Sequence, residues 1–160
     1  MACLEQEVAD LLRRKGLTLG AVESATGGLI SHLITSVSDS SDYYHGSITS
    51  YSNEVKIKVV GVKEDTIKRY GAVSYQVAEE MAEGGRKMLG VDICVADTGI
   101  AGPMGATPEK PVGLFYLGLS HRSGTYSRKH IFQGSREQNK RSAAEAALSW
   151  LKKYLLSLDY

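Results

Sequence analysis

The sequence predicts an α/β protein, a three-layer α/β/α sandwich built on a mixed, mostly parallel sheet of about five strands. Two observations lead to this prediction. In the first half of the chain, short apolar segments of β-favouring residues alternate with amphipathic helical patterns, as in sheets that are covered by helices. In the second half, strand patterns at about 91–97, 112–119 and 126–132 follow one another without a helix between them, so at least one antiparallel pairing is expected.

The elements of the first half follow from apolar spacing and from the residues that end helices. Helical spacing predicts a first helix over 3–15, and Gly16 suits the position just after its end. A short strand follows at 17–22, and the next helix is expected to begin near Thr26. A polar loop then leads to a strand at about 45–51.

The remaining helices are recognised by the polar residues that cap them. Asn53 is the expected N-cap of a helix that runs to about residue 60, and a short helix is predicted at 64–70. Ser74 caps a longer helix, and Ser135 starts the last one. We find no internal repeat or interdomain linker, so residues 1–160 are expected to form one domain.

Composition excludes several classes of function. The formal net charge of +1 removes the electrostatic case for nucleic acid or an anionic membrane, and no apolar run approaches the roughly 20 residues that span a bilayer. The first residues are too acidic and polar for a signal peptide. Two cysteines without a C-x-x-C pair fit a reducing cytoplasm, and no His/Cys cluster has metal-ligand spacing. We therefore expect a cytoplasmic protein with no metal and no cofactor.

Ser24 lies where an apolar, β-favouring segment ends and a helical pattern begins, within residues 22–28. A hydroxyl at such a turn is held beside backbone N–H groups that have no helical partner. Those N–H groups and the helix dipole can stabilise an oxyanion or a phosphate. A serine at the start of a helix is also a common N-cap, so the pattern fits a purely structural role as well.

Lys56 is the candidate base for Ser24, because serine plus lysine is a minimal nucleophile–base pair for acyl transfer. A free lysine has a pKa of about 10.4 and is nearly always protonated at neutral pH. Burial would disfavour its charge, and so would the positive end of a helix that Asn53 caps. Tyr51 comes just before that helix and is expected to line the pocket or hydrogen-bond either partner. A surface position for Lys56 and strand packing for Tyr51 are the alternatives.

A glycine- and proline-rich segment, 99–113, connects two of the predicted strands and contains all three prolines of the chain. Its glycines are spaced G-x-x-G-x-x-G, unlike the G-x-G-x-x-G of a dinucleotide-binding loop, and its prolines argue against a following helix. A long, stiff connection is one interpretation. Because it follows a strand, it is also expected to lie beside Ser24 at the same sheet edge, where ligands of α/β sheets bind.

Three cations, Arg136, Lys140 and Arg141, gather around the start of the last helix. Cations are mildly unfavourable at a helix N-terminus unless an anion compensates them, so a phosphate site and a solvated face both remain open. The candidate substrate-binding residues are therefore those of the predicted second helix start, the glycine-rich segment and this cluster: Thr26, Gly27, Gly28, Gly99, Gly102, Lys110, Arg136, Lys140 and Arg141.

Five motifs in order resemble the CinA C-terminal domain family, the nicotinamide-nucleotide amidohydrolases, over essentially the whole chain. They are Glu23-Ser24-Ala25-Thr26-Gly27-Gly28, Tyr51-Ser52-Asn53-Glu54-Val55-Lys56, Gly71-Ala72-Val73-Ser74, Thr98-Gly99-Ile100-Ala101-Gly102-Pro103 and Glu109-Lys110-Pro111-Val112-Gly113.

This resemblance implies a metal-free amidohydrolase that converts nicotinamide mononucleotide to nicotinate mononucleotide and ammonia. It implies Ser24 as nucleophile, Lys56 as base and Tyr51 as an assisting residue, with N–H groups at the start of the Thr26 helix holding the oxyanion. The partner is then a small-molecule nucleotide, and relatives commonly pair as homodimers. A nucleotide-binding regulatory module without turnover, or a serine hydrolase of another small amide or ester, are the alternatives.

The chain departs from the family pattern at several positions. Ala25 stands where many relatives have cysteine, Ser47 replaces an expected glycine, and Asp97 falls where a small or apolar residue is expected. Lys140 stands where a second arginine is common. Because only arginine grips a phosphate bidentately, this last departure bears on substrate affinity more than on chemistry.

Overall fold

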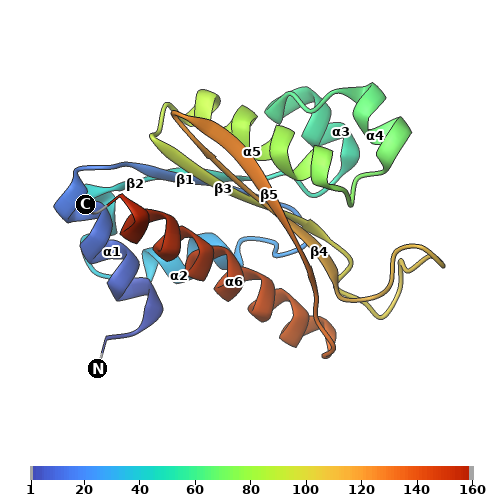
Figure 1. The fold of residues 1–160 in the computed structure, drawn as a ribbon. Helices are drawn as coiled ribbons and strands as arrows, with labels where there is room; N and C mark the ends of the chain where they lie inside the picture. The colour runs from blue at the N-terminus through green and yellow to red at the C-terminus, as the bar shows by residue number, and fades with distance from the viewer. Residues whose placement is uncertain (1, 159–160) are drawn as a thin grey trace.

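A computed structural model of the chain, which describes residues 2–158, contains the predicted α/β/α sandwich (Figure 1). Its sheet has five strands in the order β2-β1-β3-β4-β5. They are β1 (Leu19–Glu23), β2 (Tyr44–Thr49), β3 (Ile93–Gly99), β4 (Leu114–His121) and β5 (Gly124–Ile131). β1 pairs in parallel with β2 and β3, whereas β4 is antiparallel to both β3 and β5. Four strands thus share one direction, and the expected mixed, mostly parallel sheet is confirmed.

Helices cover both faces of this sheet (Figure 1). One face carries α1 (Leu4–Lys15), α2 (Leu29–Thr35) and α6 (Arg136–Ser157). The other carries α3 (Asn53–Val55), α4 (Glu64–Tyr70) and α5 (Tyr75–Leu89). A 3-10 turn, η1 (Ser40–Asp42), precedes β2, and a π-helical segment, η2 (Lys56–Val60), continues α3. None of the helices within residues 2–158 has the length and apolar character that a membrane crossing requires.

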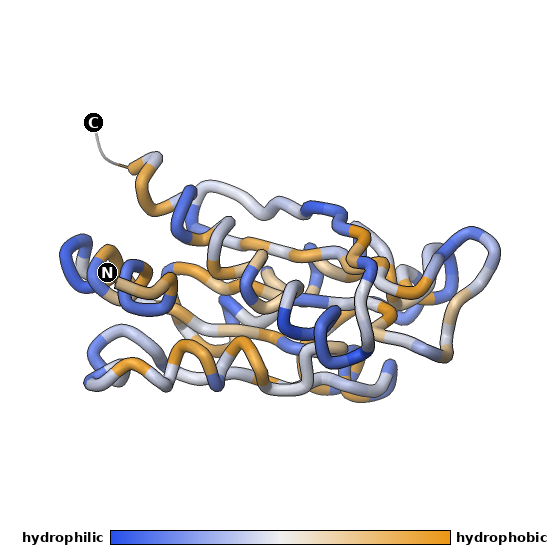
Figure 2. Tube along the Cα trace, turned by 90° about the horizontal axis from the view of Figure 1, so that it is seen from below, coloured by the Kyte–Doolittle hydropathy of each residue, from blue (hydrophilic) through white to orange (hydrophobic). Residues whose placement is uncertain are grey.

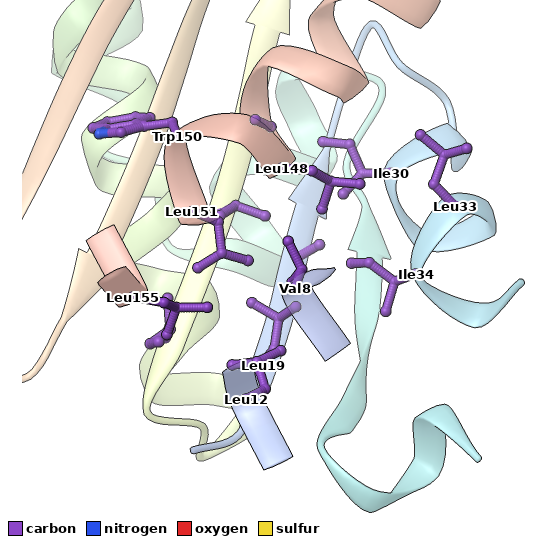
Figure 3. Close-up of a cluster of buried hydrophobic side chains, with 14 of the residues drawn as sticks. Val8, Leu12, Leu19, Ile30, Leu33, Ile34, Leu148, Trp150, Leu151 and Leu155 are labelled. Atoms are coloured by element: carbon purple, nitrogen blue, oxygen red, sulfur yellow. The ribbon is translucent and has the colours of Figure 1, made fainter. Parts of the chain in front are cut away.

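The larger core lies between the sheet and the helices α1, α2 and α6 (Figure 3). Leu12, Leu19, Ile30, Leu148 and Leu151 are almost fully buried there and come from all three helices and β1. Along the helices in Figure 2, hydrophobic and hydrophilic residues alternate from turn to turn. This periodicity explains why the sequence located these helices correctly.

The smaller core lies between the opposite face and α5, which packs unusually close to the sheet. A Cβ on Gly85 would meet Val22 at 2.2 Å, and one on Gly118 of β4 would meet the carbonyl oxygen of Ala78 at 2.3 Å. Because Gly85 and Gly118 have no Cβ, α5 can pack this close to the sheet. That depth fixes the ends of β1 and β3 beneath the loops that carry the candidate site.

Two predicted helix starts differ from the structure. The helix expected near Thr26 begins at Leu29, because the preceding residues form turns around the buried carboxylate of Glu23. The helix expected to be capped by Asn53 is capped by Ser52 instead, whose hydroxyl accepts the N–H of Val55 at 3.1 Å.

Candidate active site

Ser24 and Lys56 meet in a cavity at the carboxyl ends of β1 and β3. Ser24 directly follows β1, and β3 ends at Gly99, where the glycine-rich segment begins. The cavity has a volume of about 260 Å³ and is lined by Ser24, Lys56, Tyr51, Gly99 and Arg136, among others. These strands are parallel neighbours, and ligands of α/β sheets bind at this kind of edge. The glycine-rich segment therefore lies beside Ser24, as the sequence predicts.

The Lys56 amine is buried and has three polar contacts. Its Nζ lies 2.9 Å from Ser24 Oγ, 2.9 Å from the carbonyl oxygen of Ser50 and 3.0 Å from that of Tyr51. Only 2% of the residue is exposed. Burial lowers the pKa of Lys56, and the nearby carboxyl of Asp97 opposes this by raising it. The cause is desolvation, which penalises the ammonium form.

The three contacts leave Lys56 with suitable partners both before and after it loses a proton. A neutral lysine has two N–H donors and one lone pair, and the two carbonyls of Ser50 and Tyr51 take both N–H groups. As an ammonium, Lys56 Nζ donates to all three oxygens, and loss of the proton that it shares with Ser24 Oγ leaves its lone pair facing that oxygen. A base at hydrogen-bond distance from the proton it removes satisfies the geometric requirement for general-base catalysis.

Backbone N–H groups after Ser24 are mostly committed to two buried carboxyls. Asp97 accepts the N–H of Ser24 at 3.0 Å and that of Thr26 at 3.1 Å. Glu23 accepts three more, from Gly28, Ile30 and Ser31, at 2.8–3.1 Å. The prediction that the helix start near Thr26 holds an oxyanion is therefore wrong, because these donors are already used.

Ala25 is the exception in this turn. The N–H groups of Gly27 and Leu29 donate to the carbonyl oxygens of Ser24 and Thr26. Across residues 24–31 of the described chain, only the N–H of Ala25 makes no hydrogen bond within residues 2–158, and Ala25 lines the cavity. The N–H of the residue after Ser24 is thus left as a donor that faces the cavity.

Asp97 is the functional candidate that the sequence analysis did not assign. It is fully buried at the end of β3, and burial raises its pKa from an ordinary value near 3.8 to about 6. The Glu23 carboxylate also raises the pKa of Asp97, while hydrogen bonds from Thr26 and Ser24 lower it. The signal in the sequence was a single acid inside an otherwise apolar strand pattern.

Comparison with known proteins agrees with this architecture. A sequence model of the CinA C-terminal domain matches residues 1–155. The chain belongs to the CinA C-terminal domain family. It is 48% identical to a CinA-like protein of Salinibacter ruber over 95% of its length and 46% identical to one of Kosmotoga olearia over 97%. It spans only 37% and 38% of these two relatives, respectively.

Solved structures of the family have the same fold. The competence damage-inducible protein A of Klebsiella pneumoniae is 30% identical with a TM-score of 0.94, and the match covers 98% of this chain and 97% of that one. The competence/damage inducible protein CihA of Agrobacterium tumefaciens is 33% identical with a TM-score of 0.86, covering 97% and 99%. The matches thus extend over nearly the whole of this CinA domain.

Arg136 is the cation that this CinA domain places at the cavity. Its Nη1 donates to the carbonyl oxygen of Gly102 at 2.8 Å, and its Nη2 donates to the phenol oxygen of Tyr51 at 3.2 Å. The Tyr51 phenol thus contacts Arg136, whereas the Tyr51 carbonyl contacts Lys56. Tyr51 lies in the site as predicted, but its hydroxyl pairs with the guanidinium and with neither member of the Ser24–Lys56 pair.

The other predicted cations lie elsewhere. Lys140 and Arg141 line a second depression of about 510 Å³ beside α2, together with Thr26, Gly27 and Gly28. Arg141 also pairs with Glu145 of the same helix at 3.0 Å. These five predicted residues are not among those that line the Ser24 cavity. The turn of the chain at 26–28 carries Thr26, Gly27 and Gly28 into this depression, and Lys140 and Arg141 line it from α6.

Lys110 anchors the glycine-rich segment. Its Nζ donates to the carbonyl oxygen of Tyr70 at 2.6 Å, so the ammonium is tied to the end of α4. Asn139, a buried residue of α6 that the sequence analysis missed, holds the other side of this segment. Its amide donates to the carbonyl oxygens of Ala101 at 3.0 Å and Gly134 at 3.1 Å. Within residues 2–158, no group of His, Cys, Asp and Glu side chains could hold a metal ion.

Proposed function

We propose that this CinA domain is an amidohydrolase that converts nicotinamide mononucleotide to nicotinate mononucleotide and ammonia through an acyl-enzyme on Ser24. The 2.9 Å contact between Ser24 Oγ and the buried Lys56 amine carries the proposal. Membership of the CinA family supports the choice of substrate, which comes from the resemblance of the five motifs.

In the first step, neutral Lys56 takes the hydroxyl proton while Ser24 Oγ attacks the carboxamide carbon. The carbonyl oxygen becomes an oxyanion, and the uncommitted N–H of Ala25 is the donor that the turn leaves for it. Protonated Lys56 then gives its proton to the leaving nitrogen, so that ammonia departs and an ester of Ser24 remains.

In the second step, a water molecule attacks the ester carbon while Lys56 takes one of its protons. The second tetrahedral intermediate collapses, the bond to Ser24 Oγ breaks, and Lys56 returns the proton to that oxygen. The carboxylic acid product loses its remaining proton to solvent. The protein therefore ends in its starting state, and no redox partner is required.

The phosphate of the substrate would bind at Arg136. A guanidinium has five N–H donors, and Gly102 and Tyr51 use two of them, so donors remain for an anion. Charge-assisted bonds of this kind are the stronger ones in proteins. Arg136 lines the same cavity as Ser24, which supports the proposal that one small molecule contacts both residues.

Ammonia release from nicotinamide mononucleotide tests this function, with the dephosphorylated riboside as a second substrate. We expect the nucleotide to be processed with the higher kcat/KM, because only it has the phosphate that Arg136 would hold. Equal kcat/KM values for the nucleotide and the riboside would contradict a phosphate site at Arg136. Binding of the nucleotide without ammonia release would favour a regulatory module instead.

A further inference from the structure

Three buried side chains beneath Ser24 form a chain of very short oxygen–oxygen contacts. Thr26 Oγ1 lies 2.6 Å from Glu23 Oε1 and 2.5 Å from Asp97 Oδ1. Glu23 and Asp97 are fully buried and Thr26 is 1% exposed, so the three oxygens are shielded from bulk solvent. Contacts of this length between oxygen atoms require a hydrogen atom in each.

Counting protons shows that one hydroxyl cannot serve both contacts. Thr26 has a single O–H, which can donate to Glu23 or to Asp97 but not to both. If both acids were ionised, the remaining contact would place a carboxylate oxygen against a hydroxyl oxygen with no hydrogen between them. One of the two carboxyls must therefore carry a proton in this arrangement.

The backbone hydrogen bonds favour Asp97, and not Glu23, as the carboxyl that carries the proton. Asp97 accepts only two backbone N–H groups, those of Ser24 and Thr26, whereas Glu23 accepts three, so Asp97 is the carboxyl with fewer donors around it. Burial already raises the pKa of Asp97 to about 6. When the Thr26 hydroxyl donates to Glu23, it no longer stabilises an ionised Asp97, and the carboxyl keeps its proton to higher pH still.

The charge of Asp97 matters because Lys56 is close to it. Asp97 faces Glu23 from β1 and Lys56 from η2, and an ionised Asp97 raises the pKa of Lys56. Ser24 lies between them, since its N–H donates to Asp97 and its Oγ contacts Lys56. An anion at this point would therefore help to keep Lys56 protonated and unable to act as a base.

We propose that Glu23, Thr26 and Asp97 hold one proton between them, so that below the pH at which these three residues release it Asp97 is a neutral positioning residue that fixes the Ser24 turn without placing a second negative charge beside Lys56. The proton count stands on the contacts alone. Its consequence for the base rests on the proposed function.

The first experiment counts the proton without using any substrate. NMR of the protein with isotope-labelled aspartate carboxyls is recorded over a pH titration. We expect one aspartate to titrate with a midpoint at or above about 6, to be lost in Asp97→Asn and to remain in Asp65→Asn, an exposed control. Titration of every aspartate below about pH 5, in the ordinary range, would overturn the proposal.

The assignment does not depend on the Asp97→Asn protein folding. Every other aspartate within residues 2–158 is exposed, so a dissolved paramagnetic probe broadens their signals and spares that of Asp97. Protection of the high-midpoint signal supports the proposal. Broadening of that signal overturns it, because the proton would then belong to a surface carboxyl.

A second experiment tests the effect on the base through the pH profile of ammonia release. If Asp97 is neutral while Lys56 works, Asp97→Asn lowers kcat by disturbing the turn but moves the rising limb by less than about one pH unit. A shift of that limb to lower pH by more than about one unit would show that Asp97 is charged beside Lys56. Should no substrate be turned over, the proposed function fails, and the NMR titration still decides the proton count.

Discussion

Asp97 should make the stability of this domain fall as the pH rises through a narrow window. Its pKa in the folded protein is about 6, against an ordinary value near 3.8, so between these values the folded state binds a proton that the unfolded chain has released. This contribution to stability is complete below about pH 4 and is lost as the pH rises through about 6. At about 1.4 kcal/mol for each pH unit, this pKa difference corresponds to about 3 kcal/mol.

Urea unfolding of wild type and Asp97→Asn between about pH 4 and pH 7 measures this effect. Asparagine cannot ionise, so the difference in unfolding free energy, wild type minus variant, should decrease by about 3 kcal/mol across the window. The constant cost of placing an amide against the two N–H donors cancels in this comparison. Asp65→Asn, which removes an exposed carboxylate on α4, controls for the loss of a surface charge. A difference that stays constant or increases with pH would refute the assignment of a raised pKa to Asp97.

The remaining predictions concern three residues of the cavity and its walls. Lys56→Met should abolish most ammonia release near neutral pH while the exposed control Lys68→Met retains it, and a defect of only a few-fold would exclude Lys56 as the base. Arg136→Ala removes a charge-assisted contact of about 1.5–3 kcal/mol, so KM for the nucleotide should rise about 10- to 100-fold with a smaller change in kcat. The exposed control Arg69→Ala should leave KM unchanged, and a matching rise in that variant would show that the effect is not specific to Arg136. Asn139→Ala leaves the buried carbonyl oxygen of Ala101 without its partner and should lower the unfolding free energy by about 1–3 kcal/mol in urea. An unchanged midpoint would contradict the role of Asn139 in holding the glycine-rich segment.

Most of the fold could be predicted because its elements have strong periodicity. The helices α1, α5 and α6 were located by apolar spacing and caps, and α6 begins directly after Ser135, whose side chain forms a capping box with Gln138. The antiparallel pairing of the last strands followed from the absence of helices between them. The start of α2 was missed because the Glu23 carboxylate and two glycines with positive φ, Gly27 and Gly28, hold the chain in turns before Leu29. Local propensity does not register such a buried carboxylate.

The meeting of Ser24 and Lys56 was predictable because both follow strands that end at the same sheet edge. Asp97 was not, because its hydrogen bonds to the Ser24 turn span more than seventy residues of sequence. In the sequence it was only an unexpected acid in a strand. Arg136 and Lys140 were grouped as one cluster because they are close in the sequence, and the structure separates them. They lie one helical turn apart in α6, yet Arg136 lines the Ser24 cavity and Lys140 lines the depression beside α2.

The most direct test of the central claim is ammonia release from nicotinamide mononucleotide by Ser24→Ala. Only the attacking oxygen is removed, so the fold and most of the nucleotide affinity should persist while the rate falls by several powers of ten. Ser123→Ala, which removes a hydroxyl from the exposed turn between β4 and β5, should release ammonia at the wild-type rate. Near wild-type release by Ser24→Ala, with the same fold, would contradict an acyl-enzyme on Ser24.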